Sequence, residues 1–157
     1  MKYILLVGDA KVGKTTAINR VFKWLNTNGY NVLDNVPLPR GDFRALIEKE
    51  GTKVVVNSAS DNFALIVDLQ KFHPNEYDVL ISSCRTNEDA MKLYDDFYEI
   101  IVEKTDEKNV IEIPMAKINN HPRCAASCAT LRSDYNAKIV ALTEYVFKAF
   151  VEQNVNP

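Results

Sequence analysis

Short apolar runs alternate along the chain with longer segments in which apolar residues recur every three or four positions. The short runs are mostly continuous, as expected for strands that are covered on both faces. The longer segments have the spacing of amphipathic helices. The short runs predict strands at residues 3–7, 30–33, 53–57, 78–84 and 109–113. The longer segments predict helices at residues 13–28, 42–51, 61–72, 86–101 and 135–150.

Two stretches allow more than one interpretation. Residues 61–72 have apolar residues at helical spacing, whereas residues 65–68 alone have the composition of a strand hairpinned onto the preceding one. A helix is favoured, because a connection between parallel strands must cross over. Residues 115–130 are mixed in character and predict a loop or a broken helix.

The alternation of strands and helices predicts an α/β fold. We expect a three-layer sandwich, with helices on both faces of a mostly parallel five-stranded sheet. The 157 residues are expected to form a single domain. Ligands of such sheets bind beyond the carboxyl ends of the strands. Site residues are therefore expected at Asp34, at residues 57–61, at residues 84–86 and from Met115 onward.

Composition limits the classes of partner. The chain has 19 basic and 21 acidic residues, and a formal net charge of −2 argues against broad binding of nucleic acid. No apolar run approaches the length that spans a membrane, and the first apolar run is too short for a secretory signal. The three cysteines are odd in number and widely spaced, which indicates free thiols and a cytoplasmic location.

A glycine-containing segment joins the first predicted strand to the first predicted helix. It consists of Gly8, Asp9, Ala10, Lys11, Val12, Gly13, Lys14, Thr15 and Thr16, and it fits the pattern G-x-x-x-x-G-K-[ST] at every fixed position. Glycines let successive N–H groups point into one concavity, and the helix adds the positive end of its dipole. We therefore predict that this segment binds the phosphates of a nucleotide. Lys14 would contact the β- and γ-phosphates, and the Thr15 hydroxyl would bind Mg²⁺.

This segment and the order of elements resemble the P-loop NTPase superfamily, and within it the small-molecule and nucleotide kinases. The resemblance implies binding of ATP, with GTP as a second option, together with Mg²⁺ and a small-molecule acceptor of the γ-phosphoryl group. Members of this branch often carry an acidic residue at the end of the second strand, where Asp34 stands. Asp34 would align the acceptor hydroxyl, and Lys14 would hold the phosphates. Arg85, or the arginines expected in the late loop, Arg123 and Arg132, would stabilise the transferred charge. Further candidates for phosphate contact are Arg40, Arg44, Arg123 and Arg132.

Two other functions remain open. The loop of GTPases commonly carries the residue types of Asp9 and Val12 at these positions, so the segment resembles that branch as well. However, the D-x-x-G switch motif is absent after the loop, and residues 86–89 lack the lysine of the guanine-reading [NT]-K-x-D motif. A GTPase or ATPase switch acting on a protein partner is therefore the alternative to a kinase. A non-catalytic nucleotide-binding module is the third option, because no second acidic motif is unambiguous.

A second ligand for Mg²⁺ is expected after an apolar strand. Asp61 follows residues 53–57 closely and is preferred to Asp68, which falls within the predicted helix at residues 61–72. Asp61 is equally suited to capping that helix.

The cysteines have competing interpretations. His121, Cys124 and Cys128 have a spacing compatible with zinc, but a fourth ligand would have to be remote, such as Cys84. Packing as small apolar side chains is favoured for them. Cys84, at the carboxyl edge of the sheet, is either a reactive thiol or a buried structural residue, and the second is favoured.

Overall fold

The computed structural model describes residues 1–72, 77–86, 92–102, 105–118 and 125–152. Within them lie the strands β1 (Lys2–Gly8), β2 (Asn31–Pro37), β3 (Phe43–Lys49), β4 (Thr52–Asn57), β5 (Val79–Arg85) and β6 (Val110–Pro114). They form one six-stranded sheet in the order β2-β3-β4-β5-β1-β6. β4, β5, β1 and β6 pair in parallel, whereas β3 is antiparallel to both β2 and β4. The predicted α/β class is confirmed, but the predicted mostly parallel, five-stranded sheet is wrong, because the sheet is mixed and has six strands.

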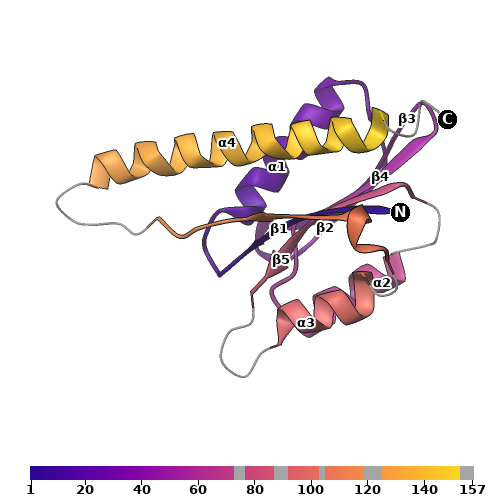
Figure 1. Ribbon diagram of the computed structural model, residues 1–157, viewed down its shortest axis with the longest axis horizontal. Helices are drawn as coiled ribbons and strands as arrows, with labels where there is room; N and C mark the ends of the chain where they lie inside the picture. The colour runs from indigo at the N-terminus through magenta and orange to yellow at the C-terminus, as the bar shows by residue number, and fades with distance from the viewer. Residues whose placement is uncertain (73–76, 87–91, 103–104, 119–124, 153–157) are drawn as a thin grey trace.

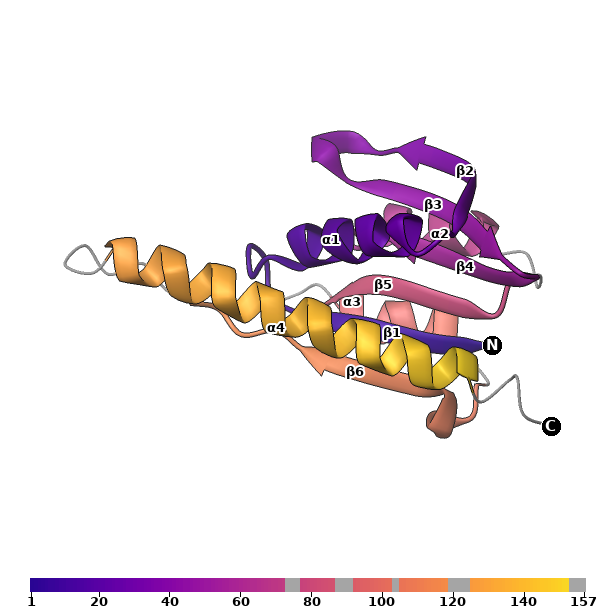
Figure 2. The ribbon, with the colours of Figure 1, turned by 90° about the horizontal axis from the view of Figure 1, so that it is seen from above.

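Helices cover both faces of the sheet (Figures 1 and 2). One face carries α1 (Lys14–Thr27) and α4 (Ala125–Glu152). The other carries α2 (Phe63–Phe72) and α3 (Leu93–Phe97), which continues as a π-helical turn at Tyr98–Val102. Short 3₁₀ turns lie at Pro39–Gly41 and Glu107–Asn109.

Strand β1 shows why its apolar run is continuous. Ile4 and Leu6 are buried in the core on the side of α1 and α4. Tyr3 and Leu5 are buried in the second core, on the side of α2 and α3. Because successive strand residues face opposite sides of a sheet, a strand with helices on both sides must be apolar at every position.

The segment predicted as a helix at residues 42–51 forms strand β3 and a tight turn, so that prediction is wrong. Phe43 and Ile47 belong to the alternating residues that β3 buries on the side of α1. Glu50 and Gly51 make the turn into β4 with φ angles of 52° and 81°. Positive φ at both turn positions suits a two-residue hairpin, and the pairing with β4 decides the structure of this segment.

Strand β2 continues to Pro37, past the end that was predicted at Asp34. β2 lies at the edge of the sheet, so a proline near its end removes no essential ladder hydrogen bond. Asp34 is exposed and pairs with Leu46 inside the β2–β3 hairpin. The prediction that Asp34 ends the second strand is therefore wrong.

Among the remaining segments, the preference for a helix over a strand at residues 61–72 is confirmed by α2. Parts of two predictions, residues 87–91 of the long helix and residues 119–124 of the late loop, lie outside the described residues. Among the residues that are described, no helix has both the length and the apolar character needed to cross a membrane.

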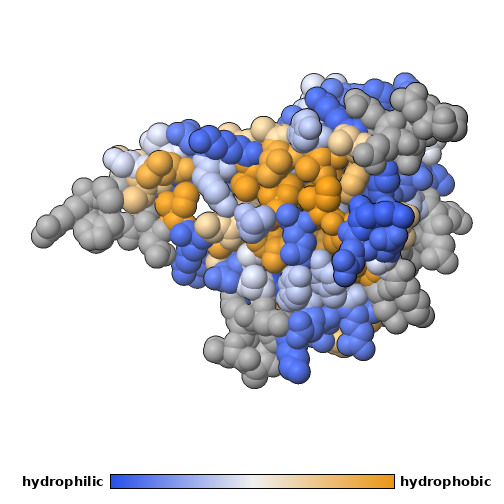
Figure 3. Space-filling view, viewed as in Figure 1, coloured by the Kyte–Doolittle hydropathy of each residue, from blue (hydrophilic) through white to orange (hydrophobic). Residues whose placement is uncertain are grey.

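Helix α4 begins at Ala125, well before the helix predicted from residue 135. Hydrophobic surface gathers along the middle of the face seen in Figure 3, and α4 leaves Leu131 and Leu142 exposed while it buries Val146 and Phe150. Apolar residues are therefore not confined to one side of α4. Leu131 is the one large aliphatic residue between Ala125 and Asp134, so helical spacing identified only the second half of α4.

Candidate functional site

The carboxyl ends of four parallel strands meet at one edge of the sheet. β1 ends there at Gly8, β4 at Asn57, β5 at Arg85 and β6 at Pro114. The turn of the β2–β3 hairpin lies at the same edge, because Pro37 pairs with Phe43 at the start of β3. The predicted segments at residues 57–61, residues 84–86 and from Met115 onward therefore come together, as the parallel pairing requires.

The Gly8–Thr16 segment makes a sharp bend from β1 into α1. Lys11 and Gly13 have φ angles of 61° and 97°, in the left-handed region that favours glycine. Gly8 is required for a different reason, since a Cβ atom there would lie 2.6 Å from the carbonyl oxygen of Met115. The bend therefore fits tightly against the chain that leaves β6, and its two glycines are needed for its shape.

We predict that Gly8→Ala destabilises the protein by about 1–3 kcal/mol, because the methyl group overpacks against a backbone that cannot move independently. Chemical denaturation of the two proteins measures the difference. The exposed Thr16 provides a control in the same segment, and Thr16→Ala should change stability by no more than about 0.5 kcal/mol. If Gly8→Ala and the parent protein had the same denaturation midpoint and slope, the prediction would be wrong. The backbone at Met115 would then move away from the added methyl group without cost.

Lys14 turns its side chain back into the bend. Its Nζ donates hydrogen bonds of 2.6 Å each to the carbonyl oxygens of Gly8 and Asp9, and the side chain is buried. Burial lowers the pKa of the Lys14 ammonium, and the nearby guanidinium of Arg85 acts in the same direction, against the pull of the Asp61 carboxylate. The cation therefore lies in surroundings that penalise its charge, and a bound anion would offset that penalty.

A cavity of about 310 Å³, which we call the central cavity, opens beside Lys14. It is lined by Lys11, Gly13, Lys14, Thr15, Thr16, Ser58 and Asp61. The first N–H groups of the fourteen-residue helix α1 lie at this cavity without partners inside the helix. Cationic side chains and a helix N-terminus make the central cavity a place where an anion such as a phosphate is stabilised.

Asp42 is the site residue that the sequence did not reveal. Its Oδ1 accepts hydrogen bonds from the Thr15 hydroxyl and from the Ser58 hydroxyl, each at 3.0 Å. Ser58 is held in turn by Phe43, whose N–H donates to the Ser58 hydroxyl at 2.9 Å. The start of β3 and the end of β4 thus fix a carboxylate next to the hydroxyl that was predicted to bind Mg²⁺. The sequence did not predict this placement, because residues 42–51 fit the pattern of a helix rather than that of a hairpin strand.

A second cavity of about 250 Å³, the hairpin cavity, lies beyond Asp61. It is lined by Leu38, Pro39, Arg40, Asp42, Ala59, Asp61, Asn62, Leu65 and Arg85. Arg85 is largely buried and lies 3.6 Å from the Asp61 carboxylate. The structure therefore brings Asp61, Arg85 and Arg40, three residues singled out in the sequence, to one cavity next to Lys14.

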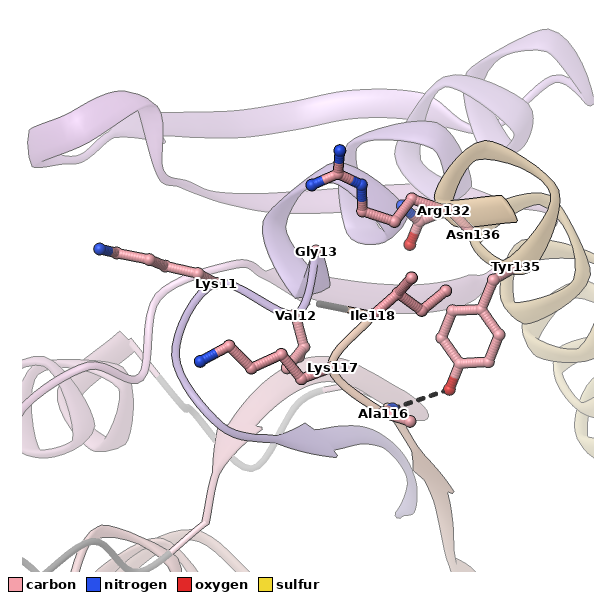
Figure 4. Close-up of a pocket in the computed structure, with 9 residues that line it drawn as sticks. All are labelled: Lys11, Val12, Gly13, Ala116, Lys117, Ile118, Arg132, Tyr135 and Asn136. Atoms are coloured by element: carbon pink, nitrogen blue, oxygen red, sulfur yellow. Dashed lines mark hydrogen bonds between the residues drawn. The ribbon is translucent and has the colours of Figure 1, made fainter. Parts of the chain in front are cut away.

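A third cavity, of about 240 Å³, lies on the other side of the bend (Figure 4). We call it the α4 cavity. It is lined by Lys11, Val12, Gly13, Ala116, Lys117, Ile118, Arg132, Tyr135 and Asn136. Arg132, predicted in a late loop, is thus a residue of α4 and lies apart from the hairpin cavity.

Other arginines have different places. Arg44 is buried in β3 and donates to Asn57 and to Asp68, whose carboxylate is 3.2 Å away. This ion pair connects α2 to the sheet, so the role of Arg44 and Asp68 is structural. Arg123 lies outside the described residues.

The cysteine at the sheet edge is buried. Cys84 is fully enclosed, and burial, followed by the nearby carboxylate of Glu112, raises the pKa of its thiol to about 12. A thiol of this kind is not a nucleophile at neutral pH, which agrees with the favoured structural interpretation. Of the possible zinc ligands, His121 and Cys124 lie outside the described residues, and Cys128 is buried in α4.

No cluster of three or more His, Cys, Asp or Glu side chains suited to a metal occurs in the described part of the chain. A Mg²⁺ ion at Thr15 and Asp42 would therefore take its remaining oxygen ligands from water and from a bound phosphate, as this cation commonly does. Hydroxyl and carboxylate oxygens are the donors that Mg²⁺ prefers, so these two residues fit the ion.

Comparisons with protein-family models, with curated proteins and with solved structures found no match.

Proposed function

We propose that this protein is a P-loop nucleotide-binding protein that binds ATP with Mg²⁺ and transfers the γ-phosphoryl group to a small acceptor. The observation that carries the proposal is the buried Lys14 ammonium at the central cavity, beside the N-terminus of α1. A desolvated cation and a helix N-terminus that face one cavity favour a multiply charged anion. The spacing of the Gly8–Thr16 segment supports a polyphosphate as that anion.

In this proposal the β- and γ-phosphates lie in the central cavity. Lys14 exchanges its two carbonyl partners for phosphate oxygens, which are stronger acceptors because they are charged. The Thr15 hydroxyl and the Asp42 carboxylate, which lie 3.0 Å apart, would hold Mg²⁺. The ion would neutralise charge on the phosphates.

The acceptor would occupy the hairpin cavity. Asp61 lines both this cavity and the central cavity, so it is placed between the phosphates and an acceptor. Its carboxylate would orient the acceptor hydroxyl or support the metal ion, and Arg85 would stabilise the transferred charge. Asp34 has no part in this proposal, because it is exposed within β2. A cytoplasmic location belongs to the same proposal, since Cys84 is a free thiol.

The proposal is tested by measuring ADP formation from ATP and Mg²⁺ with a panel of nucleosides, nucleoside monophosphates and small alcohols. ADP formation should require one class of acceptor. Arg85→Ala should lower that rate by roughly 100-fold while the affinity for ATP is retained. Arg20→Ala, at an exposed position of α1, serves as the control and should leave the rate unchanged.

Other outcomes identify the alternatives. ADP formation that needs no acceptor would favour a hydrolytic switch acting on a partner protein, and strong selectivity for GTP would support that choice. Tight nucleotide binding without any turnover would favour a non-catalytic module. Each of these results would contradict the kinase assignment.

A further inference from the structure

The three cavities form a series, because the central cavity shares lining residues with each of the other two. Lys11 and Gly13 line both the α4 cavity and the central cavity. Asp61 lines both the central cavity and the hairpin cavity. A nucleotide whose phosphates lie in the central cavity therefore has two directions in which its nucleoside can extend. The chemistry of the two outer cavities decides between them.

The hairpin cavity has charged walls, with Arg40, Arg85, Asp42 and Asp61 among its lining residues. The α4 cavity adds the aromatic ring of Tyr135 to apolar side chains such as Ile118. Its charged lining residues, Lys11, Lys117 and Arg132, are all cationic, whereas the hairpin cavity also presents two carboxylates. Figure 4 shows Lys11 and Lys117 extending in the same direction, away from Tyr135 on the opposite side of the cavity. A nucleobase prefers apolar and aromatic walls with few polar groups, so its place is the α4 cavity.

The position of Tyr135 is fixed by two hydrogen bonds to the chain that leaves β6. Its hydroxyl accepts from the Ala116 N–H at 2.9 Å, drawn as a dashed line in Figure 4, and donates to the Pro114 carbonyl at 3.2 Å. Ile118 adds an apolar side chain to the same cavity. The volume of about 240 Å³ is below the usual range for drug-sized ligands, so the cavity suits a single small ring system.

The side-chain oxygen of Asn136 accepts no hydrogen bond within the described residues. This oxygen, Oδ1, is buried. It faces the bend, since a Cβ atom built on Gly13 would lie 3.0 Å from this oxygen. A buried carbonyl oxygen without a partner is costly, and an N–H group of a ligand in the cavity would satisfy it.

We propose that the α4 cavity holds the nucleoside of the bound nucleotide and that Asn136 Oδ1 accepts a hydrogen bond from the amino group of its base. The inference rests on the proposed nucleotide binding and adds the orientation of the nucleotide. The nucleoside lies in the α4 cavity, the phosphates lie beside Lys14, and the acceptor lies in the hairpin cavity. Asn136 is then a specificity-determining residue, because bases without an amino group leave its oxygen unpaired. Arg132, one helical turn from Asn136, lines the same cavity (Figure 4).

The test compares the affinities of ATP, purine riboside triphosphate and inorganic tripolyphosphate by titration calorimetry. Purine riboside triphosphate lacks only the amino group, and tripolyphosphate lacks the nucleoside. The parent protein should bind ATP roughly threefold to tenfold more tightly than purine riboside triphosphate, the range expected for one hydrogen bond. Asn136→Ala should bind the two equally. GTP and inosine triphosphate extend the same comparison to guanine.

Two further variants complete the test. Asn26→Ala makes the same substitution at an exposed helical position and should keep the preference for ATP. Ile118→Trp should fill the α4 cavity and lower the affinity for ATP by at least tenfold. The affinity for tripolyphosphate should be retained, which would show that the bend is intact.

The outcomes separate this inference from the proposed function. Equal binding of ATP and tripolyphosphate by the parent protein would overturn the inference alone. The inference would also be overturned if Asn136→Ala lowered the affinity for all three ligands by the same factor. In that case Asn136 would only support the bend at Gly13. If the parent protein binds none of the three, the proposed function fails, and the inference fails with it.

Discussion

Replacing Lys14 by alanine is expected to weaken ATP binding by roughly 100-fold or more. Two charge-assisted hydrogen bonds to phosphate oxygens would be lost, and each is worth about 1.5–3 kcal/mol in a buried position. The loss should be large because Lys14 is nearly excluded from water and has neutral carbonyl oxygens as its hydrogen-bond partners before the anion arrives. Titration calorimetry with ATP and Mg²⁺ measures the change.

Two comparisons make this result specific to the position. Lys23→Ala removes the same charge from an exposed part of α1 and should change the affinity by less than about twofold. Lys14→Arg keeps the charge, but its planar guanidinium does not fit a cavity built around an ammonium, so most of the loss should remain. An unchanged affinity for Lys14→Ala, in a protein whose thermal unfolding shows it to be folded, would contradict the proposed function.

The parts of the site that could be predicted from the sequence are local in the chain. The bend from Gly8 to Thr16 is encoded by its own glycines and by the apolar run and amphipathic helix that flank it. Its strand–turn–helix form therefore follows from neighbouring residues alone. Helix α2 was likewise recoverable, because a parallel connection between β4 and β5 requires a crossover.

The hairpin could not be predicted from the same kind of pattern. Apolar residues at Phe43, Leu46 and Ile47 fit a helical face, and a strand face is shared only by Phe43 and Ile47. Hairpin turns with positive φ at two positions usually carry Asn-Gly or Asp-Gly, whereas here the pair is Glu50-Gly51. Because this turn signal is missing, the sequence predicts a helix here. The strand β3 and its antiparallel pairing with β2 and β4 were therefore not predicted.

The wrong prediction for residues 42–51 also changed which acidic residue was expected in the site. With β2 ending at Asp34 and a helix beginning at Asp42, Asp34 was expected at the carboxyl edge of the sheet. In the hairpin the edge lies farther along, at the turn before β3, and Asp42 takes that place beside Thr15. The one wrongly predicted element therefore placed Asp34 at the edge of the sheet, where the structure has Asp42.

Residues of the α4 cavity were missed for a different reason. Tyr135 and Asn136 are far from the Gly8–Thr16 segment in sequence and carry no motif. They reach the bend because α4 packs against α1 on the same face of the sheet. Such a contact depends on the order of the strands and the packing of the helices, which a single sequence does not specify.

The second large effect is expected from Asp42→Asn. The amide oxygen can still accept from the Thr15 and Ser58 hydroxyls, so the geometry of the hairpin turn is retained. The negative charge that would hold Mg²⁺ is lost. We expect the gain in ATP affinity that Mg²⁺ provides to fall by roughly 10-fold to 100-fold, the range seen when groups that support a metal site are altered.

The measurement is a pair of ATP titrations for each protein, one with Mg²⁺ and one with EDTA. In EDTA, Asp42→Asn should bind ATP at least as tightly as the parent protein, because a carboxylate that repels phosphate has been neutralised. Asp34→Asn changes an exposed carboxylate of the same hairpin and should leave both titrations unchanged. If Asp34→Asn instead lost the Mg²⁺-dependent gain while Asp42→Asn kept it, the acid at the predicted strand end would be the functional one. The metal site inferred from the Thr15–Asp42 contact would then be wrong.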